Sequence, residues 1–247
     1  MTIRPLLAFA SAALVAATLA ACGSDSNSDT TSTPAADTTA DAGKLIVSNP
    51  ANGKTPLITI GSKNFTEEFI LGEIYAQSLE AAGYQVKKQL NLGSEQIAFK
   101  AVKNGDVSAY PEYTGTALTS FFGVKPDDVP KDPQQAYEDV KTEAAKVGLT
   151  ALPPTPFTDS NGFALTAAKA KELGVTKISD LKDKAGELTF SGSPECRQRT
   201  DCYLGLQEVY GLKFKDYLPV DLAKRHSVLT DGQADVSVVF TTDGQIK

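Results

Sequence analysis

Strand-like and helix-like segments alternate from Leu57 to the last residue, and this alternation restricts the fold more than any other feature. The pattern predicts strands over 57–61, 84–92, 106–110, 149–152, 162–166, 188–191, 212–216 and 236–240. It predicts helices over 64–82, 94–104, 133–146, 167–173, 179–184, 203–210 and 221–229. Such alternation is typical of mostly parallel sheets covered by helices. Ligands then bind beyond the carboxyl ends of the strands.

The first predicted helix has recognisable start and stop signals. Its start, 64–67, has the pattern of a capping box, and Gly83 is well placed to end it. Between them, apolar residues recur at helical spacing. They are Ile70, Leu71, Ile74, Tyr75, Leu79 and Ala82.

Composition allows a folded chain and excludes several kinds of chemistry. The 247 residues are 41% apolar and 22% charged, which is enough to bury a core in one large domain or two lobes. Because Asp and Glu exceed Lys and Arg by 30 to 24, a nucleic-acid binder with a basic patch is disfavoured. One histidine (His226) and three cysteines leave few metal ligands or general bases. We therefore expect no metal, no cofactor and no catalytic residues.

The first residues have the pattern of a targeting segment. Arg4 precedes an apolar stretch, 6–19, which is too short for a membrane span and suits a signal peptide. The sequence then reads Leu-Ala-Ala-Cys up to Cys22, which resembles the lipobox of bacterial lipoproteins, in which the cysteine is lipidated. We predict a signal peptide over 1–21 and a lipid-anchored flexible linker over 22–56. The alternative is an ordinary secretory signal followed by a chance cysteine.

The two remaining cysteines form an even pair. Outside the cytoplasm disulfides persist, so Cys196 and Cys202 are predicted to form one. Two buried free thiols are the alternative. A zinc site is disfavoured because no second pair of Cys or His residues completes four ligands.

Aromatic residues lie where strands end or cross. The segment 110–116 places two tyrosines at a strand-to-helix turn, Phe163 begins a strand, and Phe240 ends the last one. Each ring taken singly belongs more often to a core than to a ligand site. Their shared location at strand ends favours a ligand site.

Six short segments, in this order, resemble the solute-binding proteins of osmoprotectant ABC transporters. They are 61–67 (GSKNFTE), 90–93 (LNLG), 110–116 (YPEYTGT), 178–181 (ISDL), 210–214 (YGLKF) and 240–243 (FTTD). That family binds glycine betaine, proline betaine, choline or carnitine. The resemblance implies a type II periplasmic-binding fold, with α/β lobes over 57–155 and 156–240 and a return crossing over 241–247. Since the family's chain continues further, it also implies a first lobe that is incomplete at its C-terminus.

The resemblance implies the ligand-binding residues as well. Tyr113 matches an aromatic of the quaternary-ammonium cage, and Phe163 and Phe240 stand where cage tyrosines are common. Asn161 matches a position whose backbone carbonyl faces the cationic head. Groups that hold the ligand carboxylate are matched by Lys63, Thr116 and Arg199.

The chemistry of such a ligand explains these residue types. A trimethylammonium group has no N–H to donate, so aromatic faces hold it, whereas its carboxylate needs fixed cations. The resemblance predicts a monomeric, extracytoplasmic binding protein at the cell membrane that serves an ABC permease and ATPase. An amino-acid binder is one alternative, because an NH₃⁺ group would need a buried carboxylate. A lipoprotein that only senses or scaffolds is another.

Overall fold

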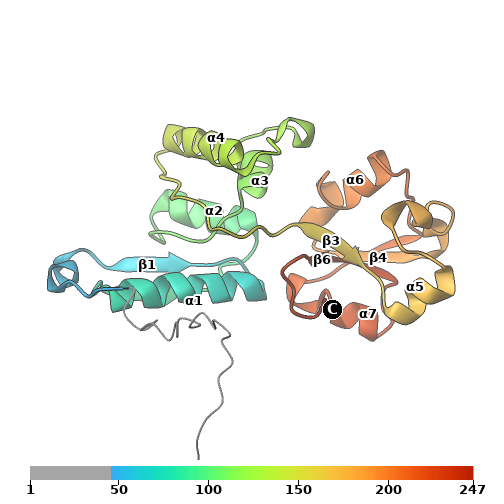
Figure 1. Cartoon of the computed structure of the whole chain (residues 1–247), viewed down its shortest axis with the longest axis horizontal. Coiled ribbons are helices and arrows are strands. Elements are labelled where there is room, and N and C mark those ends of the chain that lie inside the picture. The colour runs from blue at the N-terminus through green and yellow to red at the C-terminus, as the bar shows by residue number, and fades with distance from the viewer. Residues whose placement is uncertain (1–45, 247) are drawn as a thin grey trace, which may run out of the picture. The chain divides into compact units, whose positions relative to one another are not determined.

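The computed structural model describes residues 46–246, which contain two β-sheets (Figure 1). The first sheet pairs β1 (Ile58–Gly61) with β2 (Val86–Gln89) in parallel. The second has the strand order β3-β6-β4-β5. Its strands are β3 (Asn161–Ala164), β4 (Thr189–Gly192), β5 (Asp216–Pro219) and β6 (Val236–Phe240). Between these strands only the β3–β6 pair is antiparallel, so the prediction of mostly parallel sheets is confirmed.

Three helices that accompany the first sheet begin and end close to their predicted bounds, namely α1 (Thr66–Ala81), α2 (Glu95–Asn104) and α4 (Pro133–Lys146). Between α2 and α4 lie the short α3 (Thr114–Thr116) and the π-helical turn Ala117–Phe121, for which no helix bounds were predicted. Local signals explain α4, since the Asp132 side chain accepts a hydrogen bond from the Gln135 amide at its start. Gly105, at a φ of 79°, ends α2 in the left-handed region that glycine adopts without strain.

The buried face of α1 differs from its apolar stripe. Ile70 and Ile74 are 55% and 54% exposed, whereas Glu68, Gly72 and Ala76 are buried. A side chain at Gly72 would meet Leu90 at 2.7 Å, so α1 packs through small residues close to the segment after β2. The capping box is also absent, because the cap residue Phe65 makes no side-chain hydrogen bond.

Several predicted elements of the chain are shorter or displaced. The predicted strand 106–110 contributes an isolated bridge between Ile60 and Ala109, and 149–152 is not a strand. The strand expected at 212–216 begins only at Asp216. Before it, the Lys215 amide binds the carbonyls of Ala185 and Leu188, which directs the chain into β5. The helix predicted over 221–229 is a 3₁₀ turn followed by α7 (Ser227–Thr230).

The boundary of the predicted linker needs correction. Residues 1–45, which include the predicted signal peptide and Cys22, lie outside the described part of the chain. Within the expected linker, however, Pro50–Lys54 forms a 3₁₀ helix capped by Asn49. The Asn49 amide and the Asn52 side chain both bind the Ala82 carbonyl. Residues 49–54 therefore belong to the folded part rather than to a flexible linker, because their polar groups bind the end of α1.

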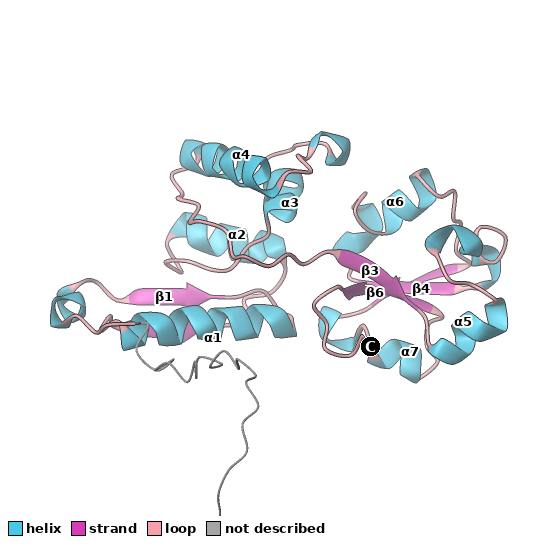
Figure 2. Ribbon diagram, in the orientation of Figure 1, coloured by secondary structure: helices cyan, strands magenta, loops and turns pink. Residues whose placement is uncertain are grey.

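An aromatic core lies at the second sheet. Phe190 on β4 is fully buried, and its ring centroid lies 5.1–5.8 Å from those of Phe163, Tyr203, Phe214 and Tyr217. In Figure 2, α6 (Tyr203–Glu208) lies on one side of these strands, and α5 (Ala167–Leu173) and α7 lie on the other. This core holds β4 and β6, whose ends carry the residues described below.

Two segments that lead into and out of the second sheet are tied together. The Thr241 amide donates to the Ser160 carbonyl at 3.0 Å, and the Ser160 amide donates to the Thr241 hydroxyl at 3.0 Å. That hydroxyl also donates to Asp159 at 3.1 Å. None of the helices between residues 46 and 246 has the length and apolar character that crossing a bilayer requires.

Candidate functional site

The ammonium group of Lys63 lies among three aromatic rings. Lys63 follows β1 and is 4% exposed. Its Nζ atom lies 4.5 Å from the ring centroid of Tyr113, 5.8 Å from that of Phe65 and 6.0 Å from that of Tyr110. Cations are attracted to aromatic faces at such distances. The segments that follow β1 and precede α3 thus form a cluster of rings that accommodates a positive charge.

Two carboxylates complete the surroundings of this ammonium group. Glu112 accepts hydrogen bonds from Lys63 Nζ at 2.6 Å, from the Tyr110 hydroxyl at 2.8 Å and from the Tyr113 amide at 2.8 Å. Glu68 is fully buried and accepts from the Lys63 amide at 3.0 Å, while its other oxygen lies 3.5 Å from Nζ. Burial raises the pKa of Glu68 to about 7, although the charge of Lys63 opposes this.

The two tyrosines are held as neutral hydrogen-bond donors. The Tyr113 hydroxyl donates to Glu67 at 2.5 Å, as that of Tyr110 does to Glu112. Burial raises the pKa of both phenols, and these neighbouring carboxylates raise it further. The rings therefore keep fixed orientations around the Lys63 ammonium group.

Phe65 joins the Tyr113 ring to the end of the second sheet. Its centroid lies 6.3 Å from that of Tyr113 and 5.1 Å from that of Phe240, the last residue of β6. The Arg225 guanidinium lies 4.6 Å from the Phe240 centroid, and Asp243 binds that guanidinium and the Phe240 amide. Tyr113 and Phe240, both predicted cage residues, thus belong to one cluster through Phe65.

Phe163 is placed differently from the other predicted cage rings. On β3 it shares a sheet face with Asn161, which is paired with Phe240. Its ring is partly buried and packs, with a centroid distance of 5.8 Å, on Phe190 in the core of the second sheet. The Asn161 side chain donates to the Asp201 carbonyl at 2.9 Å. The cage role of Phe163 remains a prediction from the resemblance, while its contacts are those of a core residue.

The predicted carboxylate-binding residues fall into two groups. Arg199 binds Asp201 through Nε at 2.8 Å and Nη2 at 2.6 Å, and its Nη1 binds Glu95 at 3.2 Å. Its Nη2 also reaches the Thr116 hydroxyl at 3.3 Å. The structure therefore brings Arg199 and Thr116 together, whereas the Lys63 ammonium group belongs to the ring cluster.

Sequence reasoning missed several members of these clusters. Phe65 and Glu112 lie shortly after the predicted strands 57–61 and 106–110, and Tyr110 is the last residue of the second of these strands. This position at strand ends was the available signal. Glu68 carried no such signal, because a carboxyl group on a helix is usually exposed. Only its contacts in the structure show that it faces Lys63.

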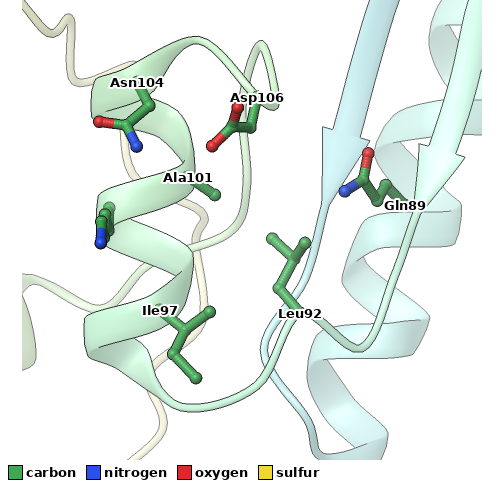
Figure 3. A pocket seen from close by; sticks show the side chains of 7 residues that line it. Gln89, Leu92, Ile97, Ala101, Asn104 and Asp106 are labelled. Atoms are coloured by element: carbon green, nitrogen blue, oxygen red, sulfur yellow. The ribbon is translucent and has the colours of Figure 1, made fainter.

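Two hollows are found beside the described elements. One, of about 400 Å³, lies between α2 and the end of β2, where Leu92 and Ile97 face the same space (Figure 3). It is lined by none of the predicted ligand-binding residues. The other, of about 290 Å³, is bordered by the segment 198–201, which contains Arg199, and by Thr119 and Ser120. The second hollow thus adjoins the predicted carboxylate-binding group.

Comparison with solved structures defines the class of protein. The chain superposes on the crystal structure of a glycine betaine/carnitine/choline ABC transporter with a TM-score of 0.55 and 24% identity, covering 76% of this chain and 70% of that one. This likeness, together with the two mostly parallel sheets, shows the type II periplasmic-binding fold.

The sequence then defines the family. Residues 56–247 match the family OpuAC, the substrate-binding domain of ABC-type glycine betaine transport systems, and the chain belongs to it. Its members are substrate-binding proteins rather than enzymes, as predicted from the sequence.

Curated relatives are longer than this chain. The glycine-betaine-binding protein of Pseudomonas aeruginosa is 32% identical over 77% of this chain and 63% of its own length. The carnitine transport binding protein OpuCC of Listeria monocytogenes is 30% identical over 76% and 62%, respectively. The chain thus spans less than two thirds of either relative.

Proposed function

We propose that this chain is the solute-binding part of an extracytoplasmic component of an ABC importer, and that its ligands are quaternary ammonium solutes such as glycine betaine or choline. Membership of the substrate-binding family supports this proposal. The proposed partners are a permease and an ATPase, and a lipid on Cys22 would hold the protein at the membrane. The proposed protein acts as a monomer without a cofactor.

The observation that carries the proposal is the ring cluster around Lys63. A methylated ammonium group cannot donate a hydrogen bond, so its binding depends on aromatic faces from which water is excluded. Tyr113, Phe65 and Tyr110 already surround a cation with such faces. The ammonium head group of a ligand would contact the same rings and would also be attracted by the carboxylates of Glu68 and Glu112.

The opposite end of a betaine is an anion. Arg199 and Thr116 present N–H and O–H donors at one place, 3.3 Å apart. A guanidinium offers a planar fork that matches a carboxylate. The proposed ligand therefore spans from the ring cluster to this donor pair.

One observation favours a second candidate, a solute with a primary ammonium group such as an amino acid. Glu68 and Glu112 are carboxylates beside the rings, and an NH₃⁺ group donates to carboxylates where a trimethylammonium group cannot. Lys63 itself is such an amine, held by both glutamates.

Calorimetry separates the two candidates. The full chain is titrated with glycine betaine, choline, carnitine and neutral amino acids, as wild type and as Tyr113→Ala. We expect quaternary ammonium solutes to bind and Tyr113→Ala to weaken them about tenfold, the loss of one ring contact. Tyr210→Ala, which removes an exposed ring, serves as the control. Binding of amino acids alone, or unchanged affinity in Tyr113→Ala, would refute the proposed cage.

A further inference from the structure

Arg199 lies inside a small ring of chain that a disulfide closes. Cys196 and Cys202 are bonded, with their Cα atoms 5.2 Å apart, and both are buried in the core of the second sheet. The segment between them contains Arg199 and its partner Asp201. The guanidinium group and the carboxylate that binds it are thus carried by the same closed loop.

Both cysteines hold the main chain of Arg199. The Arg199 amide donates to the Cys196 carbonyl at 3.3 Å, and the Cys202 amide donates to the Arg199 carbonyl at 3.1 Å. The Leu204 amide, in the first turn of α6, donates to that carbonyl as well. The position of the Arg199 Cα atom therefore depends directly on the residues that form the disulfide.

Two glycines lie where the closed loop approaches β4 and α6 too closely for a side chain. A Cβ atom at Gly192, the last residue of β4, would lie 2.8 Å from Cys196 Sγ. A Cβ atom at Gly205 in α6 would lie only 1.8 Å from the Thr200 carbonyl oxygen. The loop is consequently packed closely against the end of β4 on one side and against α6 on the other.

Asp201 sets the orientation of the guanidinium group. Its carboxylate accepts one hydrogen bond from Nε and one from Nη2. The N–H groups of Arg199 that remain are those on Nη1 and the second one on Nη2, and they lie along one edge of the guanidinium group. That edge is the one that contacts Glu95 and Thr116. Arg199, Thr200 and Asp201 also border the hollow of about 290 Å³.

We propose that the Cys196–Cys202 disulfide and Asp201 are positioning groups for Arg199, and that they set the affinity of the site for solutes that carry a carboxylate. This inference rests on the proposed function. A guanidinium group that is already oriented loses little conformational freedom when an anion binds. Fixing its orientation therefore raises the affinity for that anion. A solute without a carboxylate gains nothing from it.

A disulfide that only stabilises the fold has a different signature. Closing a short loop restricts the unfolded chain and raises stability whatever the ligand. Its removal would then change the binding of every solute alike, or of none. The comparison between a ligand with a carboxylate and one without therefore separates positioning from stabilisation.

The test uses the full chain with two ligands, glycine betaine and choline, measured by calorimetry. In the double variant Cys196→Ser/Cys202→Ser, and separately in Asp201→Asn, we expect betaine affinity to fall about tenfold, as for the loss of a charge-assisted contact. Choline affinity is expected to change less than about threefold. Asp231→Asn, at an exposed aspartate, is the control and should change neither.

Each result has a defined meaning. Equal losses for betaine and choline, or no loss for either, overturn the inference while the proposed function stands. A wild-type chain that binds neither solute refutes the proposed function, and the inference with it. Circular dichroism and urea unfolding show whether the cysteine variant is folded. If the cysteine variant is not folded, the binding of the two solutes by Asp201→Asn, which keeps the disulfide, decides whether the inference holds.

Discussion

Glu68 should make the stability of this protein depend on pH in an unusual direction. Burial raises its pKa in the folded chain from 4.5 to about 7, against the attraction of Lys63 and with a further rise from Glu112. Below pH 4.5 the carboxyl group is protonated in the folded and unfolded chain, so it costs the fold nothing. Above about pH 7 it is ionised in both, and the folded chain bears the full cost of a buried charge. Its contribution to stability is therefore lost as the pH rises from 4.5 to 7.

The gap between these two pKa values sets the size of the effect. A pKa difference of one corresponds to about 1.4 kcal/mol, so ionising Glu68 costs the fold about 3 kcal/mol. That is a large part of the net stability of an ordinary domain, about 5–15 kcal/mol. The variant Glu68→Gln keeps the shape and removes the titration.

Urea unfolding of wild type and Glu68→Gln between pH 4.5 and 8 tests this reasoning. The free energy of unfolding of wild type, relative to the variant, should decline by about 3 kcal/mol across this range. Glu138→Gln, which removes an exposed carboxylate that binds Lys141, should leave the pH dependence unchanged. A constant difference between wild type and Glu68→Gln would show that folding does not raise the pKa of Glu68, and it would refute this reasoning.

Two further predictions concern packing. Phe190→Ala removes the central ring of the second-sheet core and should lower the free energy of unfolding by about 3–5 kcal/mol, while an unchanged urea midpoint would show that this core is not closely packed. Gly205→Ala places a methyl group against the Thr200 carbonyl, so it should displace the loop between Cys196 and Cys202 and lower the thermal midpoint. Gly244→Ala, where a Cβ atom would meet nothing within 4 Å, is the matched control.

Local signals were enough to predict many elements. The start of α4 follows from Asp132 and Pro133, and α2 ends at Gly105 as its sequence indicates. Both features act within one turn of the chain, where cap hydrogen bonds and backbone sterics do not need distant partners. The alternation of such elements was sufficient to predict an α/β fold.

Elements that depend on a partner distant in the sequence were predicted less accurately. The strand expected at 106–110 forms one bridge, because strand pairing depends on a neighbour that a local pattern does not contain. Helical periodicity correctly predicted α1 as a helix, but it did not predict which face of α1 is buried. That face, at Gly72, follows from how closely the helix approaches the segment after β2.

For the candidate site, sequence alone determined which residue types are available and in which segments they lie: rings, cations and a cysteine pair. The tertiary structure decided their partners. It placed Lys63 with Glu112, 49 residues away, and Arg199 with Thr116, 83 residues away. It also packed the partly buried Phe163 ring against the core of the second sheet. The physical reason is that the energy of a buried charge or ring depends on what surrounds it in space, and folding brings those surroundings together from remote parts of the chain.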